Sequence, residues 1–222
     1  NGPRRSMLVA AFCFAGGFLV SALGIKLHQI WLVYLGYGVL GGCGLGLGYI
    51  SPVSTLMKWF PDKPGMATGM AIMGFGGGAM IGSPLAVGLM QYYASETSTG
   101  VMATMLTMGV LYFCFMMFGV ITARIPAPDW KPAGWNPASA KKDKLISTNH
   151  VSADDAIKTR QFWQLWIILC LNVTAGIGVL SVASPMIQTV LGVTAVVAGG
   201  FVGLLSLFNL LGRIGWSSLS DI

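Results

Sequence analysis

The chain has 222 residues, of which 55% are hydrophobic and 9% are charged, and its mean hydropathy is +0.73. A water-soluble domain carries about 25% charged residues, so this composition excludes a globular protein with a water-exposed surface. The formal net charge of +6 needs no nucleic-acid partner, because the positive residues lie mostly between long apolar blocks, as they do in membrane proteins.

Six apolar blocks are long enough to cross a hydrocarbon core about 30 Å thick, which takes about 20 helical residues. We therefore predict an all-α polytopic membrane protein, a bundle of about six transmembrane helices. In chain order, the predicted helices span about residues 7–25, 30–56, 65–93, 101–123, 161–191 and 193–218. A polar, proline-rich segment at 125–160 separates the first four from the last two. Within it, Asp154 and Asp155 predict the first turn of a short surface helix.

Lysine and arginine residues gather on one side of the predicted bundle. Eleven of the 13 are there: Arg4, Arg5, Lys58, Lys63, Arg124, Lys131, Lys141, Lys142, Lys144, Lys158 and Arg160. Lys26 alone is on the other side. Cytoplasmic segments of membrane proteins are enriched in Lys and Arg. We therefore predict that the first helix runs outward from the cytoplasm and that both ends of the chain are cytoplasmic.

Glycine and proline are prominent in the second and third predicted helices. Glycines recur every four residues, at Gly38, Gly42 and Gly46 in the second helix and at Gly74, Gly78 and Gly82 in the third. Residues four apart share a helix face, so these rows predict close helix packing. Pro52 and Pro84, with Pro185 in the fifth helix, each remove a backbone hydrogen bond and bend the helix. Either the helices move during gating, or this is the ordinary composition of membrane helices.

Arg213 lies inside the sixth block, well before its cytoplasmic end. A charge within the bilayer costs about 3 kcal/mol or more and normally faces a cavity or a partner. One interpretation is an anion-binding arginine, whose planar fork suits a carboxylate. The other is a guanidinium that reaches the cytoplasmic surface and pairs with Asp221. None of the six blocks contains Asp, Glu or His, which favours an anionic substrate over a cationic one.

Other motifs predict no cofactor and no metal. The cysteines are far apart within apolar blocks, at Cys13, Cys43, Cys114 and Cys170, which is typical of neither a disulfide framework nor a zinc site. Residues 36–41 fit the pattern GxGxxG, but they lie within a membrane helix rather than after a soluble strand. An intramembrane enzyme would need clustered acid, base or nucleophilic groups at one depth, and the sequence contains none, so we do not predict an enzyme.

Two terminal segments resemble the major facilitator superfamily. Residues 1–5, NGPRR, resemble the end of that fold's loop between helices two and three, and residues 210–222, LLGRIGWSSLSDI, resemble the start of its loop after helix eight. The resemblance implies that the chain is an internal segment covering helices three to eight of the major facilitator fold. Residues 1–124 would belong to the N-terminal half, 125–160 would be the central cytoplasmic loop, and 161–222 would begin the C-terminal half.

Three further segments resemble the oxalate/formate antiporter group, which is related to monocarboxylate transporters: KWFPDK at 58–63, GMATG at 65–69 and TRQFW at 159–163. In that group an arginine of the eighth helix binds the substrate carboxylate, and Arg213 falls at this position. Tyr49 matches an aromatic residue of the pocket. Phe75 stands where the antiporter has a tyrosine, so a hydroxyl contact is missing. The resemblance implies that Arg213, Tyr49 and Phe75 bind the substrate, but it weakens the case for oxalate itself.

These features together predict a secondary active transporter of small organic anions, mono- or dicarboxylates, that works by alternating access. The expected partners are the anion and the lipid bilayer, with no nucleic acid. We expect a monomer of the full-length chain to be the functional unit, in the plasma membrane or, in a bacterium, the inner membrane. The alternative is a transporter or efflux pump for neutral or drug-like compounds, in which Arg213 has a structural role.

Overall fold

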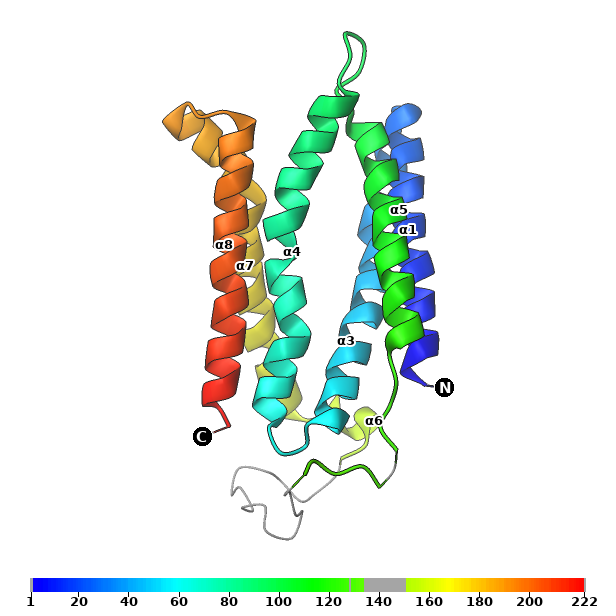
Figure 1. Cartoon of the computed structure of the whole chain (residues 1–222), viewed down its shortest axis with the longest axis vertical. Coiled ribbons are helices and arrows are strands. Elements are labelled where there is room, and N and C mark those ends of the chain that lie inside the picture. Colours follow the sequence, from blue (N-terminus) through cyan, green and yellow to red (C-terminus); the bar gives the residue numbers. More distant parts are fainter. Residues whose placement is uncertain (1, 128, 134–150, 222) are drawn as a thin grey trace.

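The computed structural model describes residues 2–127, 129–133 and 151–221, and the long elements among them are all helices (Figure 1). Six helices in this part of the chain are long and apolar enough to cross a membrane. They are α1 (Pro3–Lys26), the continuous run of α2 (Ile30–Val33), the π-helix η1 (Tyr34–Gly41) and α3 (Gly42–Trp59), then α4 (Pro64–Tyr93), α5 (Val101–Thr122), α7 (Arg160–Leu191) and α8 (Ala195–Leu219). The predicted all-α membrane fold and its six helices are confirmed, with ends close to those predicted.

Local chemistry explains where several helices begin and end. The hydroxyl of Thr159 accepts a hydrogen bond from the backbone N–H of Phe162 at the start of α7, which satisfies a donor that the first turn leaves free. Helix α7 ends at Gly192, whose φ of 64° lies in the left-handed region that glycine adopts without strain. The predicted short surface helix is present as α6 (Ala153–Ala156), with both aspartates in its first turn.

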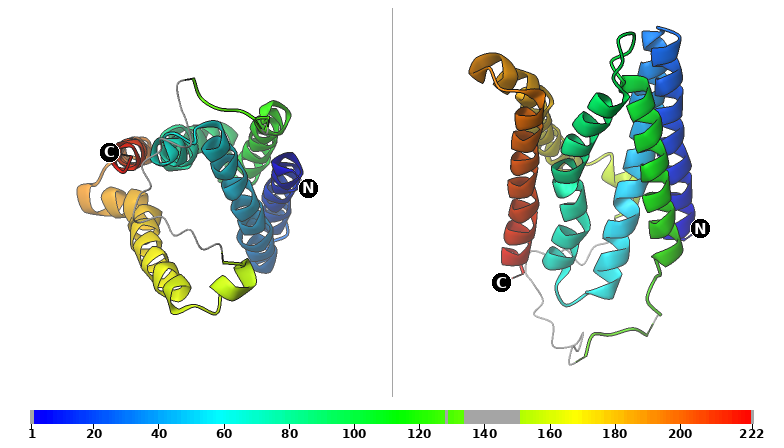
Figure 2. Two further views of the ribbon diagram at one scale, coloured as in Figure 1. Left: turned by 90° about the horizontal axis from the view of Figure 1, so that it is seen from below. Right: turned by 45° about the horizontal axis from the view of Figure 1, so that its top comes forward.

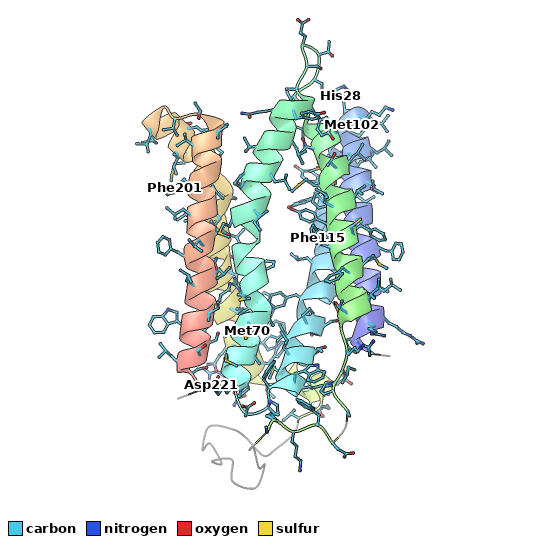
Figure 3. All side chains as sticks on the ribbon, viewed as in Figure 1. His28, Met70, Met102, Phe115, Phe201 and Asp221 are labelled. Atoms are coloured by element: carbon cyan, nitrogen blue, oxygen red, sulfur yellow. The ribbon has the colours of Figure 1, made fainter. Side chains whose placement is uncertain are left out.

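Both described ends of the chain lie at the same end of the bundle, together with the segment that leads into the central loop (Figure 1). His28 lies at the opposite end, after α1 (Figure 3). Residues 134–150 lie outside the described residues, and with them Lys141, Lys142 and Lys144 of the predicted cytoplasmic charge cluster. The division into two halves at 125–160 stays a prediction.

Helix α1 packs against α5 on one side and against η1 and α3 on the other. The most extensive interface, however, joins α4 to α8, which lie side by side although the central loop separates them in the sequence (Figure 2). Helix α4, which precedes the central loop, therefore packs against helix α8, which follows it. It is the interface that positions the candidate site.

The π-helix η1 was not predicted, and it is the part of the second membrane helix that lies against the upper part of α1 between Gly17 and Ser21. A Cβ atom added at Gly36 would lie 2.6 Å from both the carbonyl oxygen of Gly17 and the hydroxyl of Ser21, so the two backbones are in direct contact here. Ser21 is fully buried, and its hydroxyl donates a hydrogen bond of 2.8 Å to the carbonyl oxygen of Gly17. Single π turns within α-helices occur often at functional sites. In this chain the π segment coincides with the stretch that contacts α1.

The closest helix contacts fall on glycines other than those predicted. An added Cβ would meet backbone atoms of α1 at Gly44, 2.6 Å from the Phe14 nitrogen, and side chains of α8 at Gly76. In the predicted rows, a Cβ at Gly38, Gly42, Gly46, Gly74 or Gly78 would meet nothing within 4 Å in the described chain, and one at Gly82 would lie 3.3 Å from the Tyr112 hydroxyl.

The predicted rows therefore make few close helix contacts among the described residues, and their packing role stays a prediction. Gly44 and Gly76 each lie two residues from a predicted row, which is a rotation of about 200° around an α-helix. Four-residue spacing identifies a glycine row but does not say which side of the helix meets a neighbour. The gating role of the predicted rows stays a prediction, and Pro52, Pro84 and Pro185 do lie inside α3, α4 and α7.

Candidate functional site

Arg213 lies on α8, half-buried, on the side that meets α4. Its Nε donates a hydrogen bond of 2.7 Å to the Oδ1 of Asn209, one helical turn earlier on the same face. Its guanidinium carbon lies 5.6 Å from the ring centroid of Phe75 on α4, a distance at which the ring face attracts a cation. The arginine is therefore held by one polar and one aromatic neighbour within the interface between α4 and α8.

Phe75 links Arg213 to the third predicted residue. Its ring meets the ring of Tyr49, on α3, in an edge-to-face arrangement with centroids 5.7 Å apart. Tyr49, Phe75 and Arg213 thus form a continuous row across α3, α4 and α8. The structure brings together the three residues that the sequence singled out, although they lie far apart in the chain.

A cavity of about 250 Å³ opens beside this row. Tyr49, Pro52 and Phe75 line it together with Phe14 of α1 and Met116 of α5. A water molecule takes about 30 Å³ of liquid, so a space of this size admits a small organic molecule. Its lining is largely apolar, with the phenol of Tyr49 as a polar group. Arg213 is not among the lining residues and reaches the cavity's edge only through its contact with the Phe75 ring.

Asp221 does not pair with Arg213. Its two carboxylate oxygens accept hydrogen bonds of 2.7 Å from the backbone N–H groups of Gly65 and Met66 in the first turn of α4. Figure 3 shows Asp221 at the end of α8 beside the start of α4. A carboxylate is favoured at a helix N-terminus because the unpaired N–H groups there carry partial positive charge. The interpretation in which Arg213 pairs with Asp221 is wrong in this arrangement.

Sequence reasoning missed three residues around Arg213. Asn209 could have been found, since a polar residue four positions before an intramembrane arginine shares its helix face. Ser206, buried on α8, donates a hydrogen bond of 2.6 Å to the carbonyl oxygen of Gly76 on α4, and nothing in the sequence predicted that pairing. Gly76 itself stood outside the predicted glycine row.

No cluster of three or more His, Cys, Asp or Glu side chains suited to a metal ion lies within the described ranges. The groups that converge on the site are a guanidinium, an amide, a phenol and an aromatic ring. This set can orient and neutralise an anion, because the guanidinium offers fixed N–H donors.

A family model described as the Major Facilitator Superfamily matches residues 2–222. The chain is 27% identical over 221 residues to the Oxalate:formate antiporter of Oxalobacter formigenes, covering 99% of this chain and 48% of that protein. It is 24% identical over 225 residues to the Uncharacterized MFS-type transporter YhjX of Escherichia coli (strain K12), covering 99% and 50% respectively. A shorter match of 88 residues, 40% identical, to the Apicoplast pyruvate carrier 1 of Toxoplasma gondii covers 38% of this chain and 15% of the carrier. The chain spans about half the length of the first two of these relatives.

Proposed function

The chain belongs to the Major Facilitator Superfamily, and from that premise we propose that it is part of a secondary active transporter for small organic anions that works by alternating access. Members of the family are transporters rather than enzymes, and the six apolar helices make this a multi-pass integral membrane protein. Two of the relatives are named for oxalate, formate or pyruvate, all of them small carboxylates.

The observation that carries the proposal is the setting of Arg213. A guanidinium does not lose its proton in proteins, so it keeps its charge within the membrane interior. Asn209 orients this charge without neutralising it, and Phe75 covers one face. An intramembrane charge is costly unless a partner compensates it. A substrate carboxylate would supply that compensation, and Tyr49 and Phe75 would shape the cavity beside it.

The two halves would rock against each other about the interface of α4 and α8, and the glycine rows with Pro52 and Pro84 would allow the helices to bend and slide. The one-sided distribution of Lys and Arg supports cytoplasmic positions for both ends of this chain. We further propose that the full-length chain works as a monomer in the plasma membrane, which in a bacterium is the inner membrane.

One observation favours the alternative substrate class. The cavity beside Tyr49 is lined mainly by apolar groups, which suits a neutral or drug-like compound. In that case Arg213, satisfied in part by Asn209 and Phe75, would serve only to hold α8 against α4.

The test is thermal stability of the purified full-length protein against oxalate, formate and pyruvate, in the parent, in Arg213→Gln and in Arg124→Gln. A ligand at 100 times its Kd stabilises the folded state by about 2.7 kcal/mol, which raises the melting temperature. We expect stabilisation by at least one carboxylate, lost in Arg213→Gln and kept in Arg124→Gln, which removes an exposed cation outside the site. Stabilisation that survives Arg213→Gln, or that only neutral compounds produce, would favour the alternative.

A further inference from the structure

The main chain of α4 comes unusually close to Arg213 at Gly76. A Cβ atom added there would lie 2.8 Å from the Nε of Arg213, 2.9 Å from its Cδ and 2.9 Å from the Oδ1 of Asn209. Gly76 is buried, so the missing side chain leaves a notch that the arginine and its amide partner fill. The next residue differs, because a Cβ at Gly77 would meet the flexible tip of Leu210.

A buried hydrogen bond between α8 and α4 fixes the position of Gly76 next to Arg213. The hydroxyl of Ser206 donates to the carbonyl oxygen of Gly76 at 2.6 Å. Ser206 and Arg213 are both on α8, seven residues or about two helical turns apart, and therefore face the same way. The contact ties the register of α8 to the residue of α4 that receives the arginine.

Asn209 determines which donors of Arg213 stay available. A guanidinium has five N–H donors, and Asn209 takes the one on Nε. The four donors on the Nη atoms have no hydrogen-bond partner among the described residues. A carboxylate can therefore approach end-on and accept from both Nη groups at once. Because the amide carries no charge, it orients the guanidinium without competing with an anion for it.

Resting on the proposed function, we propose that Gly76 and Asn209 are positioning residues for substrate recognition. Gly76 provides the notch that seats the Cδ–Nε segment of Arg213, and Asn209 occupies Nε so that both Nη groups point to a carboxylate. Gly76 is on α4 and Arg213 is on α8, so this seating forms only when the two helices are closed against each other. The closed interface would then present the arginine in its binding orientation.

The experiment measures Kd for oxalate, formate and pyruvate, and the ligand-free melting temperature, in the full-length protein. In Gly76→Ala the new methyl group displaces the arginine, and we expect about tenfold weaker carboxylate binding, the equivalent of one charge-assisted hydrogen bond. Gly88→Ala is the matched control, because Gly88 lies on the same helix outside the glycine rows and a Cβ there meets nothing within 4 Å among the described residues. Gly77→Ala crowds the same interface without touching Arg213, and we expect parent-like Kd values for it.

Asn209→Asp separates positioning from a structural role. The carboxylate can still accept from Nε, so we expect the ligand-free melting temperature to be kept or raised. It also neutralises Arg213, so carboxylate binding should weaken at least tenfold. If Asn209 had only a structural role in α8, Asn209→Asp would not keep the melting temperature while weakening carboxylate binding. If Gly76→Ala lowers the ligand-free melting temperature, that loss should be smaller in an Arg213→Ala background, where the methyl group meets Asn209 but no arginine.

The outcomes distinguish this inference from the proposed function. If the parent binds none of the three carboxylates, both fail together. If Arg213→Gln abolishes binding while Gly76→Ala and Asn209→Asp bind like the Gly88→Ala control, the proposed function stands and the positioning role is wrong. Weaker binding in both variants, with the control unchanged, supports the positioning role.

Discussion

At the scale of single residues, the site depends on how one charge is compensated inside the membrane. Arg213 receives a hydrogen-bond acceptor from its own helix and an aromatic face from α4. Neither neighbour neutralises the positive charge, so an anion bound beside Arg213 would still lower the cost of placing that charge in the membrane. Phe75 contributes to both parts of the site, because one neighbour of its ring is Arg213 and the other is Tyr49.

Replacing Phe75 tests the aromatic contact. A cation over an aromatic face contributes about 0.5–1 kcal/mol at a partly exposed site, so Phe75→Leu should weaken carboxylate binding about two- to fivefold. Phe75→Tyr keeps the ring and should bind at least as well as the parent. Isothermal titration of the full-length protein measures this, with Phe118→Leu on the exposed side of α5 as the control. Equal Kd values for Phe75→Leu and Phe118→Leu would contradict the contact.

Asp155, in the short helix α6 before α7, has a carboxylate with two hydrogen-bonding neighbours. The Ser152 hydroxyl donates to its carboxylate at 2.7 Å and the Lys158 ammonium lies 3.3 Å away, and these contacts hold the pKa of Asp155 below its ordinary value. Since the folded pKa is the lower one, the contribution to helix α6 is present above the ordinary pKa and is lost as pH falls through the lowered pKa.

Carboxyl-selective NMR titration measures this shift. Ser152→Ala should raise the pKa of Asp155 toward its ordinary value, because it removes the larger cause, and Lys158→Met should raise it less. A larger rise in Lys158→Met than in Ser152→Ala would reverse the assignment of the causes.

At the scale of helices, the packing of α1 against the second membrane helix depends on backbone-to-backbone contact at glycine. Gly44 is buried against Phe14 and Ala10, and the atoms that a Cβ would meet there are mainly backbone atoms, which cannot move aside singly. Gly46, two residues later on the same helix, faces open space in the described chain. Close packing therefore requires glycine at position 44, whereas no described neighbour requires it at position 46.

Alanine at these two positions should have opposite effects. Gly44→Ala forces α1 and α3 apart, and overpacking of this kind costs about 1–3 kcal/mol. Gly46→Ala should be neutral or slightly stabilising, because alanine favours a helix over glycine by about 1 kcal/mol in water. Thermal unfolding in detergent compares the two variants directly, and a drop in melting temperature for Gly46→Ala as large as that for Gly44→Ala would contradict the packing assignment.

At the scale of the whole molecule, the two predicted halves meet along α4 and α8. Contacts run from Gly65 and Gly69 near one end to Gly203 and Gly199 toward the other, so the helices lie together over much of their length. At the end where both termini lie, the Asp221 carboxylate joins the end of α8 to the first turn of α4. Any rocking motion that opens this end has to break that contact.

Asp221→Asn should therefore loosen this end of the interface. The amide keeps one acceptor oxygen but loses the charge that favours a helix N-terminus, an effect of about 0.3–2 kcal/mol. Electron–electron distance measurements between spin labels at Lys63 and Trp216, in a cysteine-free background, should show a shift toward longer distances. Asp154→Asn, which removes an equal charge from the loop helix, is the control. An unchanged distance distribution in Asp221→Asn would mean that the contact does not hold the halves closed.

The sequence by itself determined the membrane class and the six helices, and it singled out Arg213 as a candidate site residue. Each follows from a cost that a segment bears alone: a long apolar block needs lipid, and an intramembrane charge needs compensation whatever surrounds it. The resemblance to a known family added Tyr49 and Phe75. Their proximity to Arg213 could not be predicted from sequence spacing, because Tyr49, Phe75 and Arg213 lie on three different helices.

Only the tertiary structure decided which faces meet. The glycine rows at Gly38–Gly46 and Gly74–Gly82 were visible in the sequence, yet close contacts fall on Gly44 and Gly76, because a step of two residues turns an α-helix by about 200° and a repeat does not specify which side has a neighbour. For the same reason the pairing of Ser206 with the Gly76 carbonyl was found only once α8 was placed against α4. Helix formation is local and readable along the chain, whereas side-chain partners depend on the relative rotation of two helices.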